Sequence, residues 1–390
     1  QKESFIMANR NRVIYQSEGL YVSKDASLGA LADNEQLGRV QSANYSYTIN
    51  RQDVNQYGEL ARLDSIVLDP PTVNVDFSYL ITDGFNERAL GFFVQNSGTS
   101  QRGATAGANT LGNFASGHMV ATSGANIYIV TSEDGTDLNG STLGTDDTVI
   151  GIGNCYISDY SIDLSVGSLP TASVTMEGAN MRSDTSGANF RTPAINQENG
   201  DADPSNSAPK MVVLPAPSQS PGGVSSDPDR TPIALRPGDI TLHFANVDGE
   251  TIAELSGDGP AHVQSVSISL PLSRTPLQRL GSKFPFSRSV DFPVNVSLSA
   301  SAIMNQTDAS SLADVLNSGN QTVGVSIKDP DGYNAVRYEL KECKLDSESF
   351  SSSIGANKTV DLTFSAQVGG PSDNTAGLFM SGSNAQTIFA

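Results

Sequence analysis

Three histidines and two cysteines carry the widest range of possible chemistry in this 390-residue chain. A nucleophilic cysteine needs a neighbouring base, and the spacing places no histidine near Cys155 or Cys343. His118 lies in a Gly-rich stretch, whereas His243 and His262 lie in or beside apolar, alternating segments. The motifs HExxH, CxxC, GxSxG and the Gly-rich phosphate loop are absent. We therefore expect no enzyme activity, and we interpret both cysteines as small buried residues.

Acidic turns raise the alternative of a structural calcium site. The segments 134–137, 201–203 and 329–332 carry Asp-Gly or Asp-x-Asp patterns, but none completes a twelve-residue calcium loop with its terminal Glu. The same patterns are ordinary turn chemistry, so we expect no metal and no cofactor. Residues 132–147 lack Lys and Arg and form a candidate acidic loop, with Glu133, Asp134, Asp137, Asp146 and Asp147.

Two arginines are the charged residues shared by a pair of similar stretches. Arg51 and Arg274 each precede a glycine, Gly58 or Gly281, by the same number of positions. Each arginine is either a solvated residue at a strand end or the partner of a carboxylate across a domain or subunit boundary. Both interpretations stay open, and the four residues are candidate contacts between domains or subunits.

The stretches that contain these arginines are residues 38–58 and 261–281. Apolar residues alternate with small or polar ones in both, in the same phase, at Ala43, Tyr45, Tyr47 and Ile49 and at Val266, Ile268, Leu270 and Leu272. Period-two alternation is typical of a strand with one buried face. Residues 73–79 match 294–300, and 154–178 match 342–366, in the same order. We therefore expect one β-rich unit that occurs twice.

The composition supports many short strands joined by turns. Charged residues make up 17%, and no apolar run approaches the ~20 residues of a membrane-spanning helix. The net charge of −19 argues against a nucleic-acid-binding surface. Short helices are expected near 83–90, with Asp83 or Asn86 as N-cap, and near 307–316.

The expected division of the chain has four parts. Residues 1–180 form the first domain and 236–368 the second. Residues 181–235 form a linker, because eight of the 19 prolines lie between 193 and 232. Residues 369–390 form a C-terminal tail.

The order of these blocks resembles the tube domain of tail proteins from long-tailed bacteriophages. The resemblance rests on Val40–Gly58, Pro71–Tyr79 and Asn154–Gly178, and again on Val263–Gly281, Pro293–Ala300 and Glu342–Ala366. It implies a mainly β chain with two tandem copies of a β-sandwich or barrel, each with one short flanking α-helix. The long linker and the extra residues of the first copy depart from the simple pattern of the family.

The resemblance also implies a function. Six such domains, and hence three chains, form a ring with pseudo-six-fold symmetry, and rings stack into a tube. The tube conducts DNA without specific binding, and acidic residues in the bore would repel phosphates. The implied partners are further copies of the chain and other tail proteins, namely the tape measure, terminator and distal tail proteins. The implied location is the virion tail, assembled in the cytoplasm of a bacterial host, with no membrane partner.

Two alternatives remain at this point. A distal tail or baseplate ring component shares the domain but does not form long tubes. A carbohydrate-binding or adhesive β-sandwich is the alternative from another class. Sugar binding favours exposed aromatic side chains for stacking, and the chain has no Trp.

Overall fold

The structure is a computed structural model that describes residues 18–23, 34–68, 71–96, 112–121, 124–132, 138, 143, 147–184, 190–195, 211–212, 214, 234–235, 240–246, 251–255, 261–281, 284–304, 320–328, 334–351, 357 and 359–382. These residues form strands and two five-residue helices, α1 (Phe85–Ala89) and α2 (Ser116–Val120). The prediction of a mainly β chain is therefore confirmed.

The strands of the first half pair in one continuous order. Neighbours in this order are antiparallel: β2 (Asn34–Gln36), β1 (Glu18–Ser23), β8 (Ala125–Thr131), β9 (Thr148–Ser165), β10 (Thr171–Gly178), β6 (Thr72–Leu80) and β3 (Val40–Thr48). The 18-residue β9 belongs to two sheets, because its first part pairs with β8 and its second part with β10.

The strands of the second half pair in a corresponding order. Neighbours are again antiparallel: β15 (Thr251–Leu255), β14 (Ile240–Asn246), β18 (Gln321–Lys328), β19 (Asn334–Ser351), β20 (Thr359–Val368), β17 (Val294–Met304) and β16 (Ala261–Pro271). The 18-residue β19 takes the place of β9 and also runs through two sheets.

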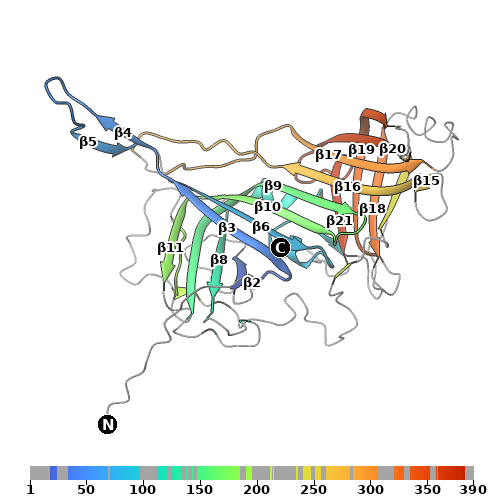
Figure 1. Cartoon of the computed structure of the whole chain (residues 1–390), viewed down its shortest axis with the longest axis horizontal. Coiled ribbons are helices and arrows are strands. Elements are labelled where there is room, and N and C mark those ends of the chain that lie inside the picture. The colour runs from blue at the N-terminus through green and yellow to red at the C-terminus, as the bar shows by residue number, and fades with distance from the viewer. Residues whose placement is uncertain are drawn as a thin grey trace, which may run out of the picture.

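One sheet joins the two halves. β16 of the second half pairs antiparallel with the second part of β9, so eight strands follow one another as β3-β6-β10-β9-β16-β17-β20-β19. Figure 1 shows these strands side by side, with the upright strands of both halves beneath them. We call this the central sheet.

Two arms leave the central sheet in the same direction. The first arm connects β3 to β6 through the hairpin of β4 (Arg51–Val54) and β5 (Asp64–Val67), which extends beyond the rest of the molecule in Figure 1. The second arm, residues 272–293, connects β16 to β17 and lies alongside the first half. Its two isolated bridges join Arg274 to Val290 and Leu277 to Ser287.

Parts of the expected linker belong to the first half. β11 (Asn180–Asp184) pairs with β9, and β12 (Phe190–Arg191) pairs with β13 (Met211–Val212). The Phe190 and Val212 side chains are buried with the first-half residues Tyr21 and Tyr128. The Asn154 side chain on β9 also holds Ile195, accepting from its N–H at 2.8 Å and donating to its carbonyl at 3.3 Å. Apolar residues between the prolines thus attach this segment to the fold.

The expected tail also differs in the structure. β21 (Gly377–Gly382) is fully buried, antiparallel to β19 and parallel to β7 (Gln95–Asn96) of the first half. The segment therefore links both halves instead of forming a separate tail. The apolar run Leu378-Phe379-Met380 explains this, because burying such side chains is favourable.

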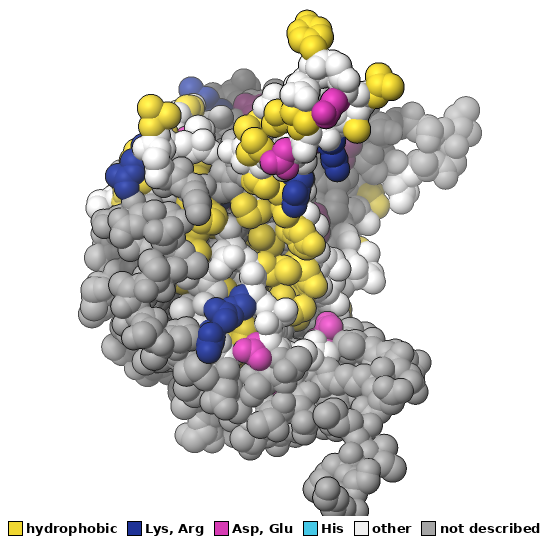
Figure 2. All heavy atoms as spheres, turned by 90° about the vertical axis from the view of Figure 1, so that its left-hand side faces the viewer, with side chains coloured by type: hydrophobic (Ala, Val, Ile, Leu, Met, Phe, Trp, Pro, Cys, Tyr) yellow, Lys and Arg dark blue, Asp and Glu magenta, His cyan; other side chains and the backbone are white. Residues whose placement is uncertain are grey.

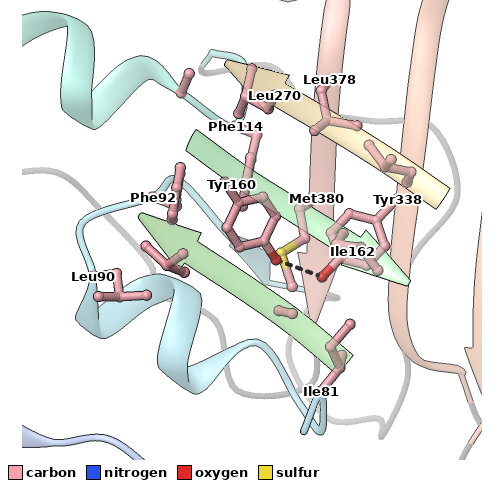
Figure 3. Close-up of a cluster of buried hydrophobic side chains, with 14 of the residues drawn as sticks. Ile81, Leu90, Phe92, Phe114, Tyr160, Ile162, Leu270, Tyr338, Leu378 and Met380 are labelled. Atoms are coloured by element: carbon pink, nitrogen blue, oxygen red, sulfur yellow. Dashed lines mark hydrogen bonds between the residues drawn. The ribbon is translucent and has the colours of Figure 1, made fainter. Parts of the chain in front are cut away.

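A continuous hydrophobic core lies under the apolar face of the central sheet. It contains buried side chains from both halves, among them Phe92, Phe114, Tyr160, Leu270 and Tyr338. Figure 3 shows these residues around the junction of β9, β16 and β19. The rings of Phe92 and Phe114 stack at 4.2 Å between centroids, and both are within 5.2 Å of the Tyr160 ring.

The helix near 83–90 is present as α1, but its start differs from the prediction. Gly84 is the N-cap in a left-handed conformation, with φ of 86°. Asp83 accepts the Phe85 N–H at 3.2 Å one residue further out. Gly84 has no side chain, so the N-cap makes no side-chain hydrogen bond. The absence of a Cβ lets the chain adopt the left-handed turn at this position. The helix expected near 307–316 lies outside the described residues.

Candidate assembly surfaces

The two faces of the central sheet have opposite character. Side chains that point into the core are apolar, as in β10 and β20, where alternate residues are buried. The other face carries mostly Ser, Thr, Asn and acidic residues, including Asp76, Asp159, Asp163, Glu177 and Asp361. Hydroxyl pairs cross between strands there, with Ser42 and Ser78 at 2.7 Å. Lys344 adds a positive charge on β19. The described residues of this polar face carry a net negative charge.

β16, the strand that joins the halves, has one buried apolar face. β16 meets β9 from Ser265 opposite Ser165 to Pro271 opposite Asp159. Its side chains at Val266, Ile268 and Leu270 are at most 1% exposed. The predicted alternation with one buried face is therefore confirmed for residues 266–272.

The equivalent strand of the first half differs. Tyr45 is 41% exposed, Tyr47 58% and Ile49 39%, although they alternate in the same phase as the buried residues of β16. The prediction of a buried face is thus wrong for β3 in the single chain. The physical reason is that β3 pairs only with β6 among the described strands, whereas β16 has β9 on its other side.

The arms expose apolar side chains as well. At the first arm Tyr57 and Leu60 are fully exposed, and Ile66 and Leu68 are more than half exposed. Figure 2 faces the end from which this arm projects and shows hydrophobic side chains at its surface. The tip of the second arm exposes Leu280 in the same way.

Arg274 reaches from the second arm into the first half. Its guanidinium donates to the His118 carbonyl at 2.7 Å and to the Arg288 carbonyl at 2.8 Å. It also lies 4.8 Å from the centre of the Tyr156 ring. Burial lowers the pKa of Arg274 to about 10. Arg274 therefore contacts the first half, but its hydrogen-bond partners are backbone carbonyls and not the expected carboxylate.

Arg51, Gly58 and Gly281 have different surroundings. The Arg51 side chain is exposed on the first arm, as expected for a solvated residue at a strand end. Gly58 and Gly281 lie near the arm tips with φ of 93° and 84°, and a Cβ at either would meet nothing within 4 Å. Both glycines therefore serve turns, and within the described chain they do not contact another domain.

A buried carboxyl that the sequence did not reveal lies where the halves meet. Glu87 on α1 accepts hydrogen bonds from Tyr79 at 3.0 Å and Tyr160 at 3.2 Å. The Tyr160 hydroxyl also lies 3.2 Å from that of Tyr338, and Figure 3 shows the two groups facing each other. Burial raises the pKa of Glu87 to about 7. Only the three-dimensional fold brings these residues together.

His118 is also buried, contrary to its Gly-rich context in the sequence. Its ring packs against Phe92 at 4.5 Å between centroids, and its Nε2 atom has no hydrogen-bond partner. Burial, with Arg274 nearby, lowers the pKa of His118 to about 3, so the imidazole is neutral. α2, which carries it, is an element that the sequence analysis did not predict.

The remaining candidate residues are partly outside the structure. Of the acidic loop, Glu133, Asp134, Asp137 and Asp146 lie outside the described residues, whereas Asp147 is buried at the start of β9. Cys155 and Cys343 are buried free thiols whose pKa burial raises to about 12. Within the described ranges, no group of three His, Cys, Asp or Glu side chains is placed to hold a metal ion. Neither of the two described helices is long and apolar enough to cross a membrane.

Comparison with known proteins identifies no family. No family model and no curated protein matches the sequence. Among solved structures, the chain is similar to a chain of the "Virion of native gene transfer agent (GTA) particle", with 14% identity and a TM-score of 0.22. The match covers 36% of this chain and 95% of that chain. A TM-score of this size supports no conclusion about function.

Proposed function

We propose that this protein is a structural, non-enzymatic virion protein, the major tail tube subunit of a bacteriophage-like particle. Three copies form a ring, and rings stack into the tube through which DNA leaves the particle. Each chain supplies two tube domains, which are tandem copies of one β-rich unit. Other tail proteins meet the tube at its ends and inside it, and the tube assembles in the cytoplasm of a bacterial host.

The observation that carries this proposal is the shared strand order of the two halves. β2-β1-β8-β9-β10-β6-β3 corresponds strand by strand to β15-β14-β18-β19-β20-β17-β16. Since β9 pairs with β16, the chain already holds two units joined head to tail in one sheet. Head-to-tail contacts of one kind generate a ring when their rotation closes.

The polar face of the central sheet supports the role as a conduit. A bore that passes DNA must not bind it, so hydroxyl and carboxylate side chains suit this surface. The five acidic residues on this face would repel DNA phosphates. The other described side chains on this face are mostly polar, so they offer little apolar surface for bases to bind. We therefore assign this face to the bore.

The arms support stacking along the tube. Exposed apolar side chains at the tips of both arms are typical of surfaces that another protein covers. The arms leave the sheet in the same direction, so each can reach the next ring. Tyr57 and Leu60 at one tip and Leu280 at the other are the residues that we assign to this contact.

Electron microscopy and mass measurement of the purified full chain test the proposal. We expect rings of three chains, and tubes at higher concentration. The variant Tyr57→Ser with Leu60→Ser should keep the rings and lose the tubes, and Asp53→Ser on the same arm is the control. Monomers at all concentrations would refute the proposal. Wild-type rings that never stack would instead favour a distal tail or baseplate ring.

A further inference from the structure

The central sheet ends in two open strand edges. Among the described strands, β3 pairs only with β6, and the last eight residues of β19, 344–351, pair only with β20. An open edge presents unpaired backbone N–H and C=O groups that readily pair with another chain. The two edges belong to different halves, so one edge of a copy can meet the other edge of the next copy.

The contact inside the chain provides the template for such a meeting. Within the chain, β16 and the second part of β9 form the corresponding pair of edges. In this pairing Ser269 lies opposite Ser161 and Ile268 opposite Ile162. The hydrogen bonds from Leu272 N–H to the Ser158 carbonyl and from Val166 N–H to the Gln264 carbonyl extend the same register at both ends.

The open edges have the same local irregularities as the paired ones. The register of β3 with β6 shifts at Gln41, and that of β16 with β17 shifts at the equivalent Gln264. Asn154 on β9 and Glu342 on β19 both have φ of 53°, at equivalent positions. Bulges and left-handed residues set the twist and direction of a strand. Because these features agree, the open edges are shaped for the same pairing.

The side chains of β3 are more exposed than those at the equivalent positions of β16, as expected for a strand without a second neighbour among the described strands. Tyr45 and Tyr47 are 41% and 58% exposed, whereas Ile268 and Leu270 at the equivalent positions of β16 are 1% and 0% exposed. In the continuous sheet, β9 and the core beside it cover β16. A neighbouring strand on β3 would provide the same cover.

We propose that β3 of one copy pairs antiparallel with the 344–351 segment of β19 in the next copy, in the register of β16 with β9. This register places Ser46 opposite Ser349, Thr48 opposite Ser347, and Tyr45 opposite position Phe350. The inference rests on the proposed function, since it needs self-assembly, and it adds which strands meet and in which register. With one geometry at every junction, the rotation between units is constant, and the series forms a ring where that rotation closes.

The side-chain contacts of the second arm do not recur at the proposed junction between copies. Arg274 lies over the Tyr156 ring on β9, and the equivalent position on β19 is Lys344. Arg51 of the first arm would therefore meet a positive charge there instead of a ring. The backbone pairing carries over to the junction between copies, and this arginine contact does not.

A disulfide between opposite serines tests the register. Ser269 and Ser161 form a non-hydrogen-bonded pair, because the hydrogen bonds at Leu272 and Gln264 fall on the alternate positions. Cα atoms in such pairs lie about 4.5 Å apart, within the range that a disulfide spans. The same parity holds for Ser46 and Ser349, which are exposed in the single chain.

The experiment mixes two full-length variants, Ser46→Cys and Ser349→Cys, under mild oxidation. We expect a disulfide-linked dimer, and the double variant should give dimers and trimers on a non-reducing gel. The double variant Ser269→Cys with Ser161→Cys is the matched control, because its disulfide forms within one chain and leaves a monomer. Wild type should give no product, since Cys155 and Cys343 are buried.

An out-of-register pair makes the outcome specific. Ser46→Cys mixed with Ser351→Cys should cross-link at least tenfold more slowly than the in-register pair. Rings or tubes without the Ser46–Ser349 disulfide would overturn the register and leave the proposed function intact. Equal rates for both pairs would also overturn it. A chain that folds but stays monomeric in the microscope and on the gel would refute both proposals.

Discussion

Replacing Glu87 with Gln should make the protein more stable at alkaline pH. Glu87 is 1% exposed, and burial raises the pKa of its carboxyl to about 7 from the ordinary 4.5. Between these two pH values the folded chain holds this proton and the unfolded chain has released it. Stability from this group is therefore fully present below pH 4.5 and is lost as the pH rises through 7.

The size of the effect follows from the two pKa values. At roughly 1.4 kcal/mol per unit of pH, the difference corresponds to about 3 kcal/mol between pH 4 and pH 8. Gln keeps the side-chain oxygen that accepts from Tyr79 and Tyr160, and it carries no ionisable proton. We expect the free energy of unfolding of the Glu87→Gln protein, relative to that of wild type, to rise by about 3 kcal/mol from pH 4 to pH 8.

Urea unfolding at several pH values measures this difference. The protein concentration must be low enough for monomers, so that assembly does not contribute to stability. Both proteins contain the other carboxyl groups, so the contribution of these groups to stability cancels when the two proteins are compared at each pH. Glu342→Gln, at an exposed glutamate, is the control for the loss of one negative charge.

Two results would refute the reasoning. Parallel stability curves for Glu87→Gln and wild type would mean that burial does not hold the carboxyl neutral. If the wild-type protein instead became more stable relative to the variant as the pH rises, the hydroxyl donors would outweigh burial and favour the ionised carboxylate.

Two further predictions compare residues at equivalent places in the two halves. Arg274→Ala should cost about 2–3 kcal/mol in urea unfolding, because it removes two charge-assisted hydrogen bonds and a ring contact, whereas Arg51→Ala should change stability by less than about 0.5 kcal/mol. Similar losses for both would contradict the contact seen for Arg274. Asn154→Ala should cost about 2 kcal/mol and speed proteolysis of the attached linker, whereas Glu342→Ala is the control, because it places Ala at the same φ of 53° without removing the two hydrogen bonds to Ile195. Unchanged proteolysis in the Asn154 variant would show that another contact holds the linker.

The strand pattern could be predicted because it is local. Alternation with period two depends on the geometry of the strand itself, so the sequence places strands at β3, β16, β6 and β17. The predicted buried face is present in β16, β6 and β17, but in β3 it is exposed. The helix at α1 was likewise visible from its spacing of apolar residues. Gly58 and Gly281 were expected as contacts between domains or subunits, and the structure places both in turns with positive φ.

The neighbours of each element could not be predicted in this way. Tyr47 and Leu270 hold equivalent places in the pattern, yet one is 58% exposed and the other 0%, because only Leu270 lies on a strand that β9 extends. Arg51 and Arg274 differ for the same reason, since only the second arm lies against another half. The Glu87 cluster joins residues from β6, α1, β9 and β19, which are distant in the sequence.

The sequence by itself thus determined the strands of the matching blocks, α1 and the resemblance between the two halves. The tertiary structure decided which edges are paired, which apolar faces are covered and which carboxyl is buried. The physical reason is range: backbone periodicity acts between residues a few positions apart. Burial and strand pairing depend on whatever part of the chain, or of a neighbouring copy, lies alongside.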